Sequence, residues 1–387
     1  MTSSARGLAP TAARTETPSG LAAARRLVVK IGSSLLVAKD GTINRAWLAA
    51  LCADIAACRQ RGQDVVIVTS GAVALGRRHL GLAEGVLRLD EKQAAAATGQ
   101  VRLAHAYQET LAHHGLTVAQ VLLTLDDSEN RRRYLNARNT LQTLLRLGAI
   151  PVINENDTVA TQEIRFGDND RLAARVAQMI AADTLVLFSD IDGLYSSDPR
   201  RDPQAKFISE VRELTAEIEA MAGDPGSSVG SGGMVTKLQA ARIALAAGCR
   251  MAIAPGRLLN PLRLMEEGGR CTWFEPRQEP LTARKQWIAG AVQPQGRMLV
   301  DAGAWRALKK GGSLLPAGVL AVIGDFQKGD AVIVLDADER PVARGLSAYS
   351  AEEARLILGR KSVDFEAMLG YRGPDEMIHR DDLVIES

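Results

Sequence analysis

Short apolar runs alternate with longer segments whose apolar residues recur every three or four positions, from residue 27 to about residue 275. The short runs are typical of buried strands, and the longer spacing is typical of amphipathic helices. Strands are predicted at 27–30, 64–70, 118–124, 150–154, 184–189 and 250–254. Helices are predicted at 44–61, 90–114, 131–147, 170–182 and 236–247. This alternation predicts an α/β fold, a three-layer αβα sandwich with a mainly parallel central sheet.

The pattern changes near residue 275. Residues 276–294 contain prolines and one helix-like stretch, and the apolar runs after them are short and separated by turns. Strands are predicted there at 296–300, 319–323, 331–335 and 341–345. We therefore expect a disordered N-terminal tail at 1–24, a first domain at 25–275, a linker at 276–294 and a small β-rich domain at 295–387.

Composition and charge narrow the class of protein. The chain has 387 residues, of which 46% are hydrophobic, which is enough to build folded domains. No apolar stretch approaches the ~18 residues of a membrane helix, so no membrane partner is expected. The net charge of +2, from 47 basic and 45 acidic residues, gives no whole-chain argument for nucleic-acid binding.

The cysteines indicate a reducing compartment. They form no C-x-x-C pair and do not lie near histidines at zinc-binding spacing. Residues 1–24 lack the hydrophobic segment of a secretory signal. We therefore expect a cytoplasmic protein with buried or incidental thiols at Cys52, Cys58, Cys249 and Cys271.

Four predicted strands run directly into small or polar residues. These are Gly32-Ser33-Ser34, Ser70-Gly71, Asn154-Glu155-Asn156-Asp157 and Ser189-Asp190. In a parallel sheet, ligands bind beyond the carboxyl ends of the strands. The sequence therefore predicts a ligand site at one edge of the sheet.

Two lysines are candidates for binding phosphate. Lys30 ends the first strand, ahead of Gly32. Lys237 closes the glycine loop Gly230-Ser231-Gly232-Gly233-Met234-Val235-Thr236-Lys237, which leads into a helix. Exposed amides at a helix N-terminus favour phosphate, although the loop lacks Walker A spacing. A surface lysine and a flexible loop with an N-cap are the alternatives.

Carboxylates and amides accompany these lysines. Gly167-Asp168-Asn169-Asp170 precedes a helix, where N-capping explains only one polar residue, and 154–157 places four polar residues after an apolar strand. The alternatives are plain capping and a polar turn. No pairing of a nucleophile with a base is evident, which fits an acceptor already ionised at pH 7, such as a carboxylate. The residues thus indicate a nucleotide-dependent phosphoryl transferase.

At these motifs the chain resembles the amino acid kinase family, and in particular its glutamate-phosphorylating members. The resemblance begins near residue 27, and its most specific stretches are 154–157 and 232–240. Shorter motifs include Leu135-Asn136-Ala137-Arg138 and Asp192-Gly193-Leu194-Tyr195. The C-terminal part resembles a PUA domain, including 312–316 and His379-Arg380-Asp381-Asp382.

The resemblance implies an ATP- and Mg²⁺-dependent kinase. Lys30 and Lys237 would contact the nucleotide phosphates, and Asp170 would organise the two lysines. The ATP site would be completed by Ser189, Asp190, Ser231, Gly232, Gly233, Met234, Val235 and Thr236. No metal-ligating residue is identified.

The resemblance also implies the acceptor, the γ-carboxylate of L-glutamate, which would become L-glutamate 5-phosphate in the first step of proline biosynthesis. Ser70, Asp157 and Asn169 would hold glutamate, with Asn154 and Asp168 as supports. Feedback inhibition by proline and a homo-oligomer, a dimer or tetramer, are further expectations from the family.

Two alternatives stay open. A sister kinase acting on aspartate or N-acetylglutamate would share the phosphate loops but is not expected to carry this C-terminal domain. An RNA-binding role would suit a PUA domain, and Lys309-Lys310 is a local basic patch. Residues 291–387, however, contain 12 Lys and Arg against 15 Asp and Glu, a charge of −3, whereas RNA binding favours a basic surface.

Overall fold

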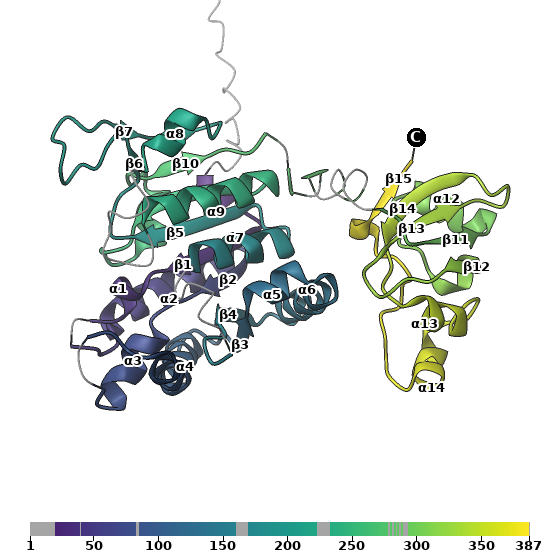
Figure 1. The fold of residues 1–387 in the computed structure, drawn as a ribbon, viewed down its shortest axis with the longest axis horizontal. Helices are drawn as coiled ribbons and strands as arrows, with labels where there is room; N and C mark the ends of the chain where they lie inside the picture. The colour runs from purple at the N-terminus through teal and green to yellow at the C-terminus, as the bar shows by residue number, and fades with distance from the viewer. Residues whose placement is uncertain are drawn as a thin grey trace, which may run out of the picture.

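The computed structural model describes residues 20–387, except for 39, 83–84, 160–168, 223–232, 278, 281, 284, 286–287, 289–292 and 387. Figure 1 shows a larger α/β domain built from the first part of the chain and a smaller β-rich domain built from the last part. Within the described ranges, no helix is long and apolar enough to cross a membrane.

An eight-stranded sheet forms the centre of the larger domain, in the order β3-β4-β2-β1-β5-β9-β10-β8. The six strands from β3 to β9 are parallel, and β10 pairs antiparallel to β9. A mainly parallel sheet is thus confirmed. The strands are β1 (Arg26–Ile31), β2 (Asp64–Val68), β3 (Val118–Leu123), β4 (Ile150–Glu155), β5 (Thr184–Ser189), β8 (Glu210–Val211), β9 (Arg250–Pro255) and β10 (Thr272–Phe274). A separate hairpin joins β6 (Leu194–Tyr195) and β7 (Phe207–Ile208).

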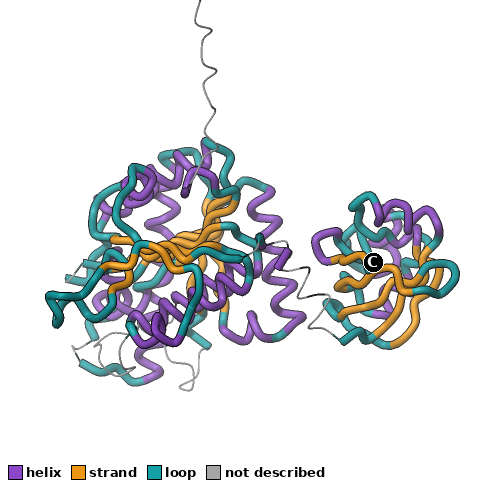
Figure 2. The backbone as a smooth tube through the Cα atoms, turned by 90° about the horizontal axis from the view of Figure 1, so that it is seen from above, coloured by secondary structure: helices purple, strands orange, loops and turns teal. Residues whose placement is uncertain are grey.

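Helices cover both faces of this sheet, as Figure 2 shows from above. The reason lies in the strands, which are apolar at successive positions: Val29 faces one hydrophobic core and Val28 the other. The first core is covered by α1 (Ser33–Leu36), α2 (Arg45–Gln60), α3 (Ala72–His79), α4 (Leu89–Ala112) and α10 (Pro261–Glu266). The second is covered by α6 (Arg131–Arg146), α7 (Asn169–Met179), α8 (Ala216–Ala220) and α9 (Met234–Ala246), with α5 (Leu125–Glu129) packed on α6 and α7. The three-layer αβα sandwich is therefore confirmed.

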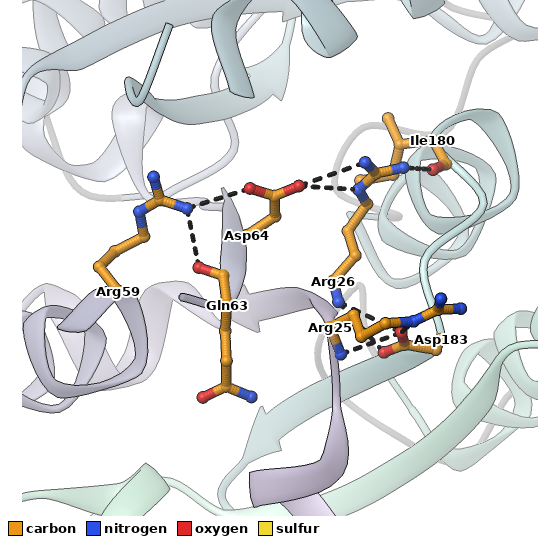
Figure 3. A network of polar contacts seen from close by, with 7 residues as sticks. All are labelled: Arg25, Arg26, Arg59, Gln63, Asp64, Ile180 and Asp183. Atoms are coloured by element: carbon orange, nitrogen blue, oxygen red, sulfur yellow. Dashed lines mark hydrogen bonds and ion pairs between the residues drawn. The ribbon is translucent and has the colours of Figure 1, made fainter. Parts of the chain in front are cut away.

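A polar network ties together the amino-terminal ends of the central strands (Figure 3). The carboxylate of Asp64, at the start of β2, accepts hydrogen bonds from Arg26 Nη2 at 3.2 Å and from Arg59 Nη1 at 3.0 Å. Asp183, just before β5, accepts from the backbone N–H groups of Arg25 and Arg26. Because these contacts link β1, β2 and β5, they fix the relative register of three adjacent strands at the edge opposite the predicted site.

Helices α3 and α4 cross at two glycines. A Cβ on Gly76 would lie 1.7 Å from the carbonyl oxygen of Ala95, and one on Gly99 would lie 1.8 Å from that of Ala72. Only glycine permits such close backbones. Gln100, the neighbour of Gly99, is buried on the same helix and accepts a hydrogen bond from Asn154 of β4.

The predicted disordered tail extends too far at its C-terminal end. Residues 1–19 lie outside the described residues, but Gly20–Ala23 form a 3-10 helix whose Leu21 is buried in the first core. The side chain of Gln63 donates hydrogen bonds to the carbonyl oxygens of Leu21 and Ala24, at 3.1 and 2.6 Å. The buried leucine and these two hydrogen bonds attach residues 20–24 to the larger domain.

The smaller domain contains a five-stranded sheet in the order β12-β11-β13-β14-β15 and has its own hydrophobic core. Its strands are β11 (Gly296–Val300), β12 (Val319–Gly324), β13 (Ala331–Leu335), β14 (Pro341–Leu346) and β15 (Leu383–Ile385). The sequence pattern did not predict β15 or the helices, because segments of three to eight residues show too little periodicity. These helices are α12 (Ala302–Lys309), α13 (Ala351–Leu356) and α14 (Phe365–Leu369), with 3-10 turns at η2 (Pro316–Gly318), η3 (Ser362–Asp364) and η4 (Arg380–Asp382).

Candidate active site

The predicted polar clusters meet at one edge of the larger sheet. Strands β4, β2, β1 and β5 are consecutive neighbours and run parallel, so their carboxyl ends lie side by side. Ser33 follows β1, Ser70 follows β2, Asn154 lies at the end of β4 and Ser189 ends β5. The prediction that these segments gather at one edge is confirmed.

Three charged side chains from three elements form a buried ion triad at this edge. Lys30 Nζ, at the end of β1, lies 2.6 Å from Asp170 Oδ1, in the first turn of α7. Lys237 Nζ, in the first turn of α9, lies 3.0 Å from Asp170 Oδ2. The exposed fractions of Lys30, Asp170 and Lys237 are 7%, 1% and 5%. The structure thus brings together three residues that lie up to 207 positions apart in the chain.

The two ammonium groups determine the charge state of Asp170. Burial by itself would raise the pKa of this carboxyl group, but the attraction of Lys30 and Lys237 outweighs it and lowers the pKa to about 2. Asp170 is therefore ionised at neutral pH. The triad carries two positive charges and one negative charge, and this net positive charge at a sheet edge is suited to an anionic ligand.

The glycine loop enters the site through the start of α9. Gly233 is the N-cap of the helix, and Met234, Val235 and Thr236 form its first turn. Thr236 Oγ1 donates to Asp170 Oδ2 at 3.1 Å and to the carbonyl oxygen of Gly233 at 2.8 Å, which joins the loop to the triad. Ser231 and Gly232 lie outside the described residues, so the predicted loop is seen only from Gly233 onward.

A chain of amide side chains lies beside the triad. Asn169, the neighbour of Asp170, donates from Nδ2 to Ser70 Oγ at 2.7 Å, to the carbonyl oxygen of Thr69 at 2.7 Å and to Asn154 Oδ1 at 3.0 Å. Asn154 Nδ2 in turn donates to Gln100 Oε1 at 2.8 Å. Three of the predicted site residues, Ser70, Asn154 and Asn169, therefore belong to one hydrogen-bond network.

Gln100 is the residue of this network that sequence reasoning missed. It lies on α4, and its segment was interpreted only as a helix of strong helix formers. One signal could have found it, because Gln100 continues the buried stripe of Ala96, Gly99 and Leu103. A polar side chain on such a stripe needs a buried partner.

Two atoms of the network have no hydrogen-bond partner among the described residues. They are Asn169 Oδ1 and Gln100 Nε2, and both are buried. An unsatisfied buried acceptor or donor is costly, and in a functional site it often marks a place for a polar group of a ligand. The network therefore fits a ligand that carries both donors and acceptors.

Asp157 supplies a carboxyl group after β4. Burial, with a smaller contribution from the nearby charge of Glu155, raises the pKa of Asp157 to about 7. Its ionised and protonated forms are thus about equally populated at neutral pH, and a bound cationic group would stabilise the ionised form. Asp168, the other predicted acidic support, lies outside the described residues.

Ser189 and Asp190 lie at the end of β5, on the other side of β1. Ser189 Oγ donates to Asp190 Oδ1 at 3.2 Å, and Arg200 Nη2 donates to Asp190 Oδ2 at 2.8 Å. Both residues therefore flank the triad on the side opposite the amide network. Within the described ranges, no group of three His, Cys, Asp or Glu side chains has the arrangement of a metal site.

Comparison with known proteins identifies the class of protein. Residues 25–255 match the model of the amino acid kinase family, and residues 296–369 match the PUA domain. The chain therefore belongs to the amino acid kinase family and has a PUA domain in its C-terminal part. Its place within the family follows from its curated relatives.

Three of these relatives are glutamate 5-kinases. The protein from Paramagnetospirillum magneticum is 69% identical over 95% of this chain and 100% of its own length. The relative from Rhodospirillum rubrum is 63% identical over 93% of this chain and 96% of its own. The relative from Agrobacterium fabrum is 58% identical, and the match covers 94% of both chains. Within its family the chain therefore groups with the glutamate 5-kinases.

Replacing Gln100 tests whether the amide network holds the site together. Gln100→Leu leaves Asn154 Nδ2 without its acceptor, a cost of about 1–3 kcal/mol. We expect a lower Tm and a KM for the amino-acid substrate raised by about tenfold, measured by thermal unfolding and steady-state kinetics. Gln100→Glu keeps the acceptor and should have the smaller effect.

Gln108→Leu is the matched control, because Gln108 is an exposed glutamine of the same helix. It should behave as the wild type in both measurements. A Gln100→Leu variant with unchanged Tm and unchanged KM would show that the hydrogen bond to Asn154 has no role in the site.

Proposed function

We propose that the protein transfers the γ-phosphoryl group of ATP to the γ-carboxylate of L-glutamate, giving L-glutamate 5-phosphate and ADP. The observation that carries this proposal is the buried triad of Lys30, Asp170 and Lys237, which places net positive charge beside a network of neutral amides. High identity to glutamate 5-kinases over nearly the whole chain supports the choice of substrate. This reaction is the first step of proline biosynthesis.

The reaction needs no general base. An oxygen of the γ-carboxylate, ionised at pH 7 because its pKa is ~4.3, attacks the γ-phosphorus of ATP. A bond forms between that oxygen and phosphorus, while the bond between phosphorus and the β,γ-bridging oxygen breaks and ADP leaves. The main obstacle is repulsion between two anions, which the protein reduces through positive charge and orientation.

Lys30 and Lys237 are the proposed catalytic cations. Each contacts the nucleotide phosphates and stabilises the negative charge that spreads over the transferring group. Asp170 holds one ammonium group on each of its carboxylate oxygens, so their positions are fixed before ATP binds. Asp170 is thus a positioning residue in this proposal.

The remaining ATP contacts come from two segments. The loop residues Ser231, Gly232, Gly233, Met234, Val235 and Thr236 lead into α9, whose free N–H groups and dipole favour phosphate. Ser189 and Asp190, at the end of β5, complete the nucleotide site.

L-glutamate occupies the side of the amide network. Asp157 pairs with the α-ammonium group, while Ser70 and Asn169 bind polar groups of the substrate. Asn154 supports Asn169, and Asp168 supports the same site. Neutral amides are suited to this side because they orient an anionic substrate without repelling it.

Mg²⁺ accompanies ATP in this proposal. The described site offers separate carboxylates rather than a dedicated cage, and such a donor set fits Mg²⁺, which is usually held by one or two carboxylates and substrate phosphates. The ion would neutralise charge on the β- and γ-phosphates. The residues assigned above to ATP and to glutamate bind and orient the two substrates around the ion.

The compartment, the oligomeric state and the regulation are inferred from the family. We propose a cytoplasmic homo-oligomer, a dimer or tetramer, that is inhibited by proline. The proposed domains are 25–275 for the kinase and 295–387 for the PUA domain, joined by the linker 276–294. RNA binding is no part of this proposal, because the PUA domain at 295–387, called the tail domain below, has a net negative charge.

A trapping assay tests the proposed substrate. Acyl phosphate formed with ATP and Mg²⁺ is converted to hydroxamate by hydroxylamine, and ADP release is measured in parallel. We expect turnover with L-glutamate and at least 100-fold lower kcat/KM with aspartate or N-acetylglutamate, since a site that pairs polar groups discriminates by about this much or more. Turnover with only aspartate or N-acetylglutamate would contradict the proposal.

Removing one lysine tests the catalytic assignment. Lys237→Ala should lower kcat by about 10²- to 10³-fold, the usual cost of losing one preorganised electrostatic contact to the transition state. Steady-state kinetics with both substrates measures this loss. The control is Lys310→Ala, at an exposed lysine of the tail domain, which should keep the wild-type kcat. A Lys237→Ala enzyme with wild-type kcat would place the chemistry elsewhere.

The pH dependence of glutamate binding tests Asp157. Because the pKa of Asp157 in the free protein is about 7 and only its ionised form pairs with an ammonium group, binding weakens as the pH falls through 7. We expect the KM for glutamate to rise about tenfold from pH 8 to pH 6, as protonation of one group predicts. The KM for ATP should change much less.

Asp157→Asn removes this titration. The variant should have a raised KM for glutamate at pH 8 and no further tenfold rise at pH 6. A wild-type KM that is flat between pH 8 and pH 6 would show that Asp157 does not bind the α-ammonium group.

A further inference from the structure

Two sequence motifs with no role in the proposed chemistry meet in a buried ion pair. Arg138 belongs to the motif 135–138 on α6, and Asp382 belongs to the motif 379–382 in the tail domain. Arg138 Nη1 donates to Asp382 Oδ1 at 2.7 Å, and Arg138 Nη2 donates to Asp382 Oδ2, so the pair is bidentate. Arg138 is 5% exposed and Asp382 is 4% exposed. A contact of this kind fixes an orientation as well as a distance.

Apolar packing surrounds the pair. Leu135, one turn before Arg138, forms a buried cluster with Ile288, Ala331 and Leu346. At Gly329 a Cβ atom would lie 2.3 Å from Leu135 Cδ1, and the φ angle of +96° also favours glycine. The two domains therefore share a close-packed interface whose shape depends on individual residues of both.

The first turn of α6 carries a charge pattern that fits this interface. Arg131, Arg132 and Arg133 lie at a helix N-terminus, where positive charge opposes the helix dipole. Asp330 of the tail domain attracts Arg131, and Asp127 of α5 lies 2.9 Å from Arg133 Nε. Acidic groups from two directions thus offset a charge pattern that is unfavourable for the isolated helix.

The interface lies toward the end of β4 that carries the proposed glutamate site. Only three residues, 147–149, separate α6 from β4, so the chain reverses and the first turns of α6 lie toward the carboxyl end of β4. Figure 1 shows α5 and α6 on the side of the larger domain that faces the tail domain.

Polar contacts continue from α6, through α5 and the end of β3, to the segment that contains Asp157. Arg133 pairs with Asp127, and Asp127 Oδ2 accepts from the backbone N–H of Thr124 at 2.6 Å. The preceding residue, Leu123, accepts at its carbonyl oxygen a 2.8 Å hydrogen bond from Asn156 N–H. The start of α6 is therefore linked to the turn at 154–157 through α5 and the residues at the end of β3.

We propose that Arg138, held by Asp382, is a positioning residue for the glutamate site: the tail domain locks the start of α6, and α6 in turn holds the 154–157 turn in its binding geometry. This inference rests on the glutamate site proposed above. It assigns the PUA domain a role in substrate binding within the same chain, through a direct contact with α6.

Single substitutions in the pair test this role. Arg138→Gln and Asp382→Asn each leave a buried group without its partner, which loosens the interface. We expect each variant to raise the KM for glutamate by about 3- to 30-fold, the range for residues that couple through such networks. The KM for ATP should stay within about twofold. Folded variants with no change, or with equal changes in both KM values, would overturn the proposal.

Matched controls lie next to each partner. Arg132→Gln changes an exposed arginine of the same helix, and Asp381→Asn changes the half-exposed neighbour of Asp382. Both should keep the wild-type KM for glutamate. A rise equal to that of Arg138→Gln would show that charge alone, and not the buried contact, affects the site.

A double variant tests the pairing itself. Arg138→Met combined with Asp382→Leu replaces the ion pair with an apolar contact of similar size, which interfaces often tolerate. Its KM for glutamate should lie closer to the wild type than that of either single variant. If the fold increase in this KM equals the product of the fold increases in the two single variants, the two residues do not act as a unit.

Hydrogen exchange on the unaltered protein provides a test that does not depend on the folding of variants. Because coupling between sites is reciprocal, bound glutamate should slow amide exchange in 131–138 and 380–385 as well as in 150–159, whereas a non-hydrolysable ATP analogue should not. Protection of 150–159 without protection of 131–138 and 380–385 would overturn this inference and leave the proposed function intact. Protection of neither segment would instead show that the glutamate site is misplaced.

Discussion

The site depends on one electrostatic constraint: two ammonium groups must stay close together in a mostly buried place. Lys30 and Lys237 repel each other, and a buried charge without a partner is costly. Asp170 resolves this by accepting one ammonium group on each oxygen. The arrangement works only if β1, α7 and α9 meet at fixed positions. The parallel pairing of β1 with β2 and β5 fixes the first of these positions, and the contacts of Asp64 and Asp183 join the same three strands at their amino-terminal ends.

The division of the site into a charged half and a neutral half follows from the same constraint. Asn169 and Asp170 are adjacent in the first turn of α7, so one helix end contributes to both halves. On the side of the triad, the two lysines leave a net positive charge. On the acceptor side, the chain Ser70, Asn169, Asn154 and Gln100 supplies hydrogen bonds with no net charge. This chain of neutral side chains can therefore bind an anionic group without adding negative charge beside the triad.

The sequence predicted the architecture of the larger domain and the edge that carries the site, because strand periodicity and strand-end polarity are local signals. Its motifs also contain Asn154, Asn169 and both lysines, which the structure brings together at that edge. Gln100 was missed because its partner is 54 residues away and a lone glutamine in a helix has no local meaning. The order at Leu21 was missed for the same reason, since it comes from Gln63 in a distant turn. The roles of all these site residues stay predictions, and Asp168, Ser231 and Gly232 also lie outside the described residues.

The contact between the two domains extends this reasoning from the site to the whole chain. The overall charge of +2 has two contributions. Residues 1–290 contain 35 basic and 30 acidic residues, and residues 291–387 have a net charge of −3. Opposite signs favour association in general, but diffuse attraction does not choose an orientation. A bidentate, buried pair does choose one, because each misaligned geometry leaves a charge without its partner. Arg138 and Asp382 thus convert a general attraction into a defined placement of the tail domain. Helix α6, which carries Arg138, is linked, through α5 and the end of β3, to the turn that carries Asp157, so the buried pair and this turn belong to one connected set of contacts.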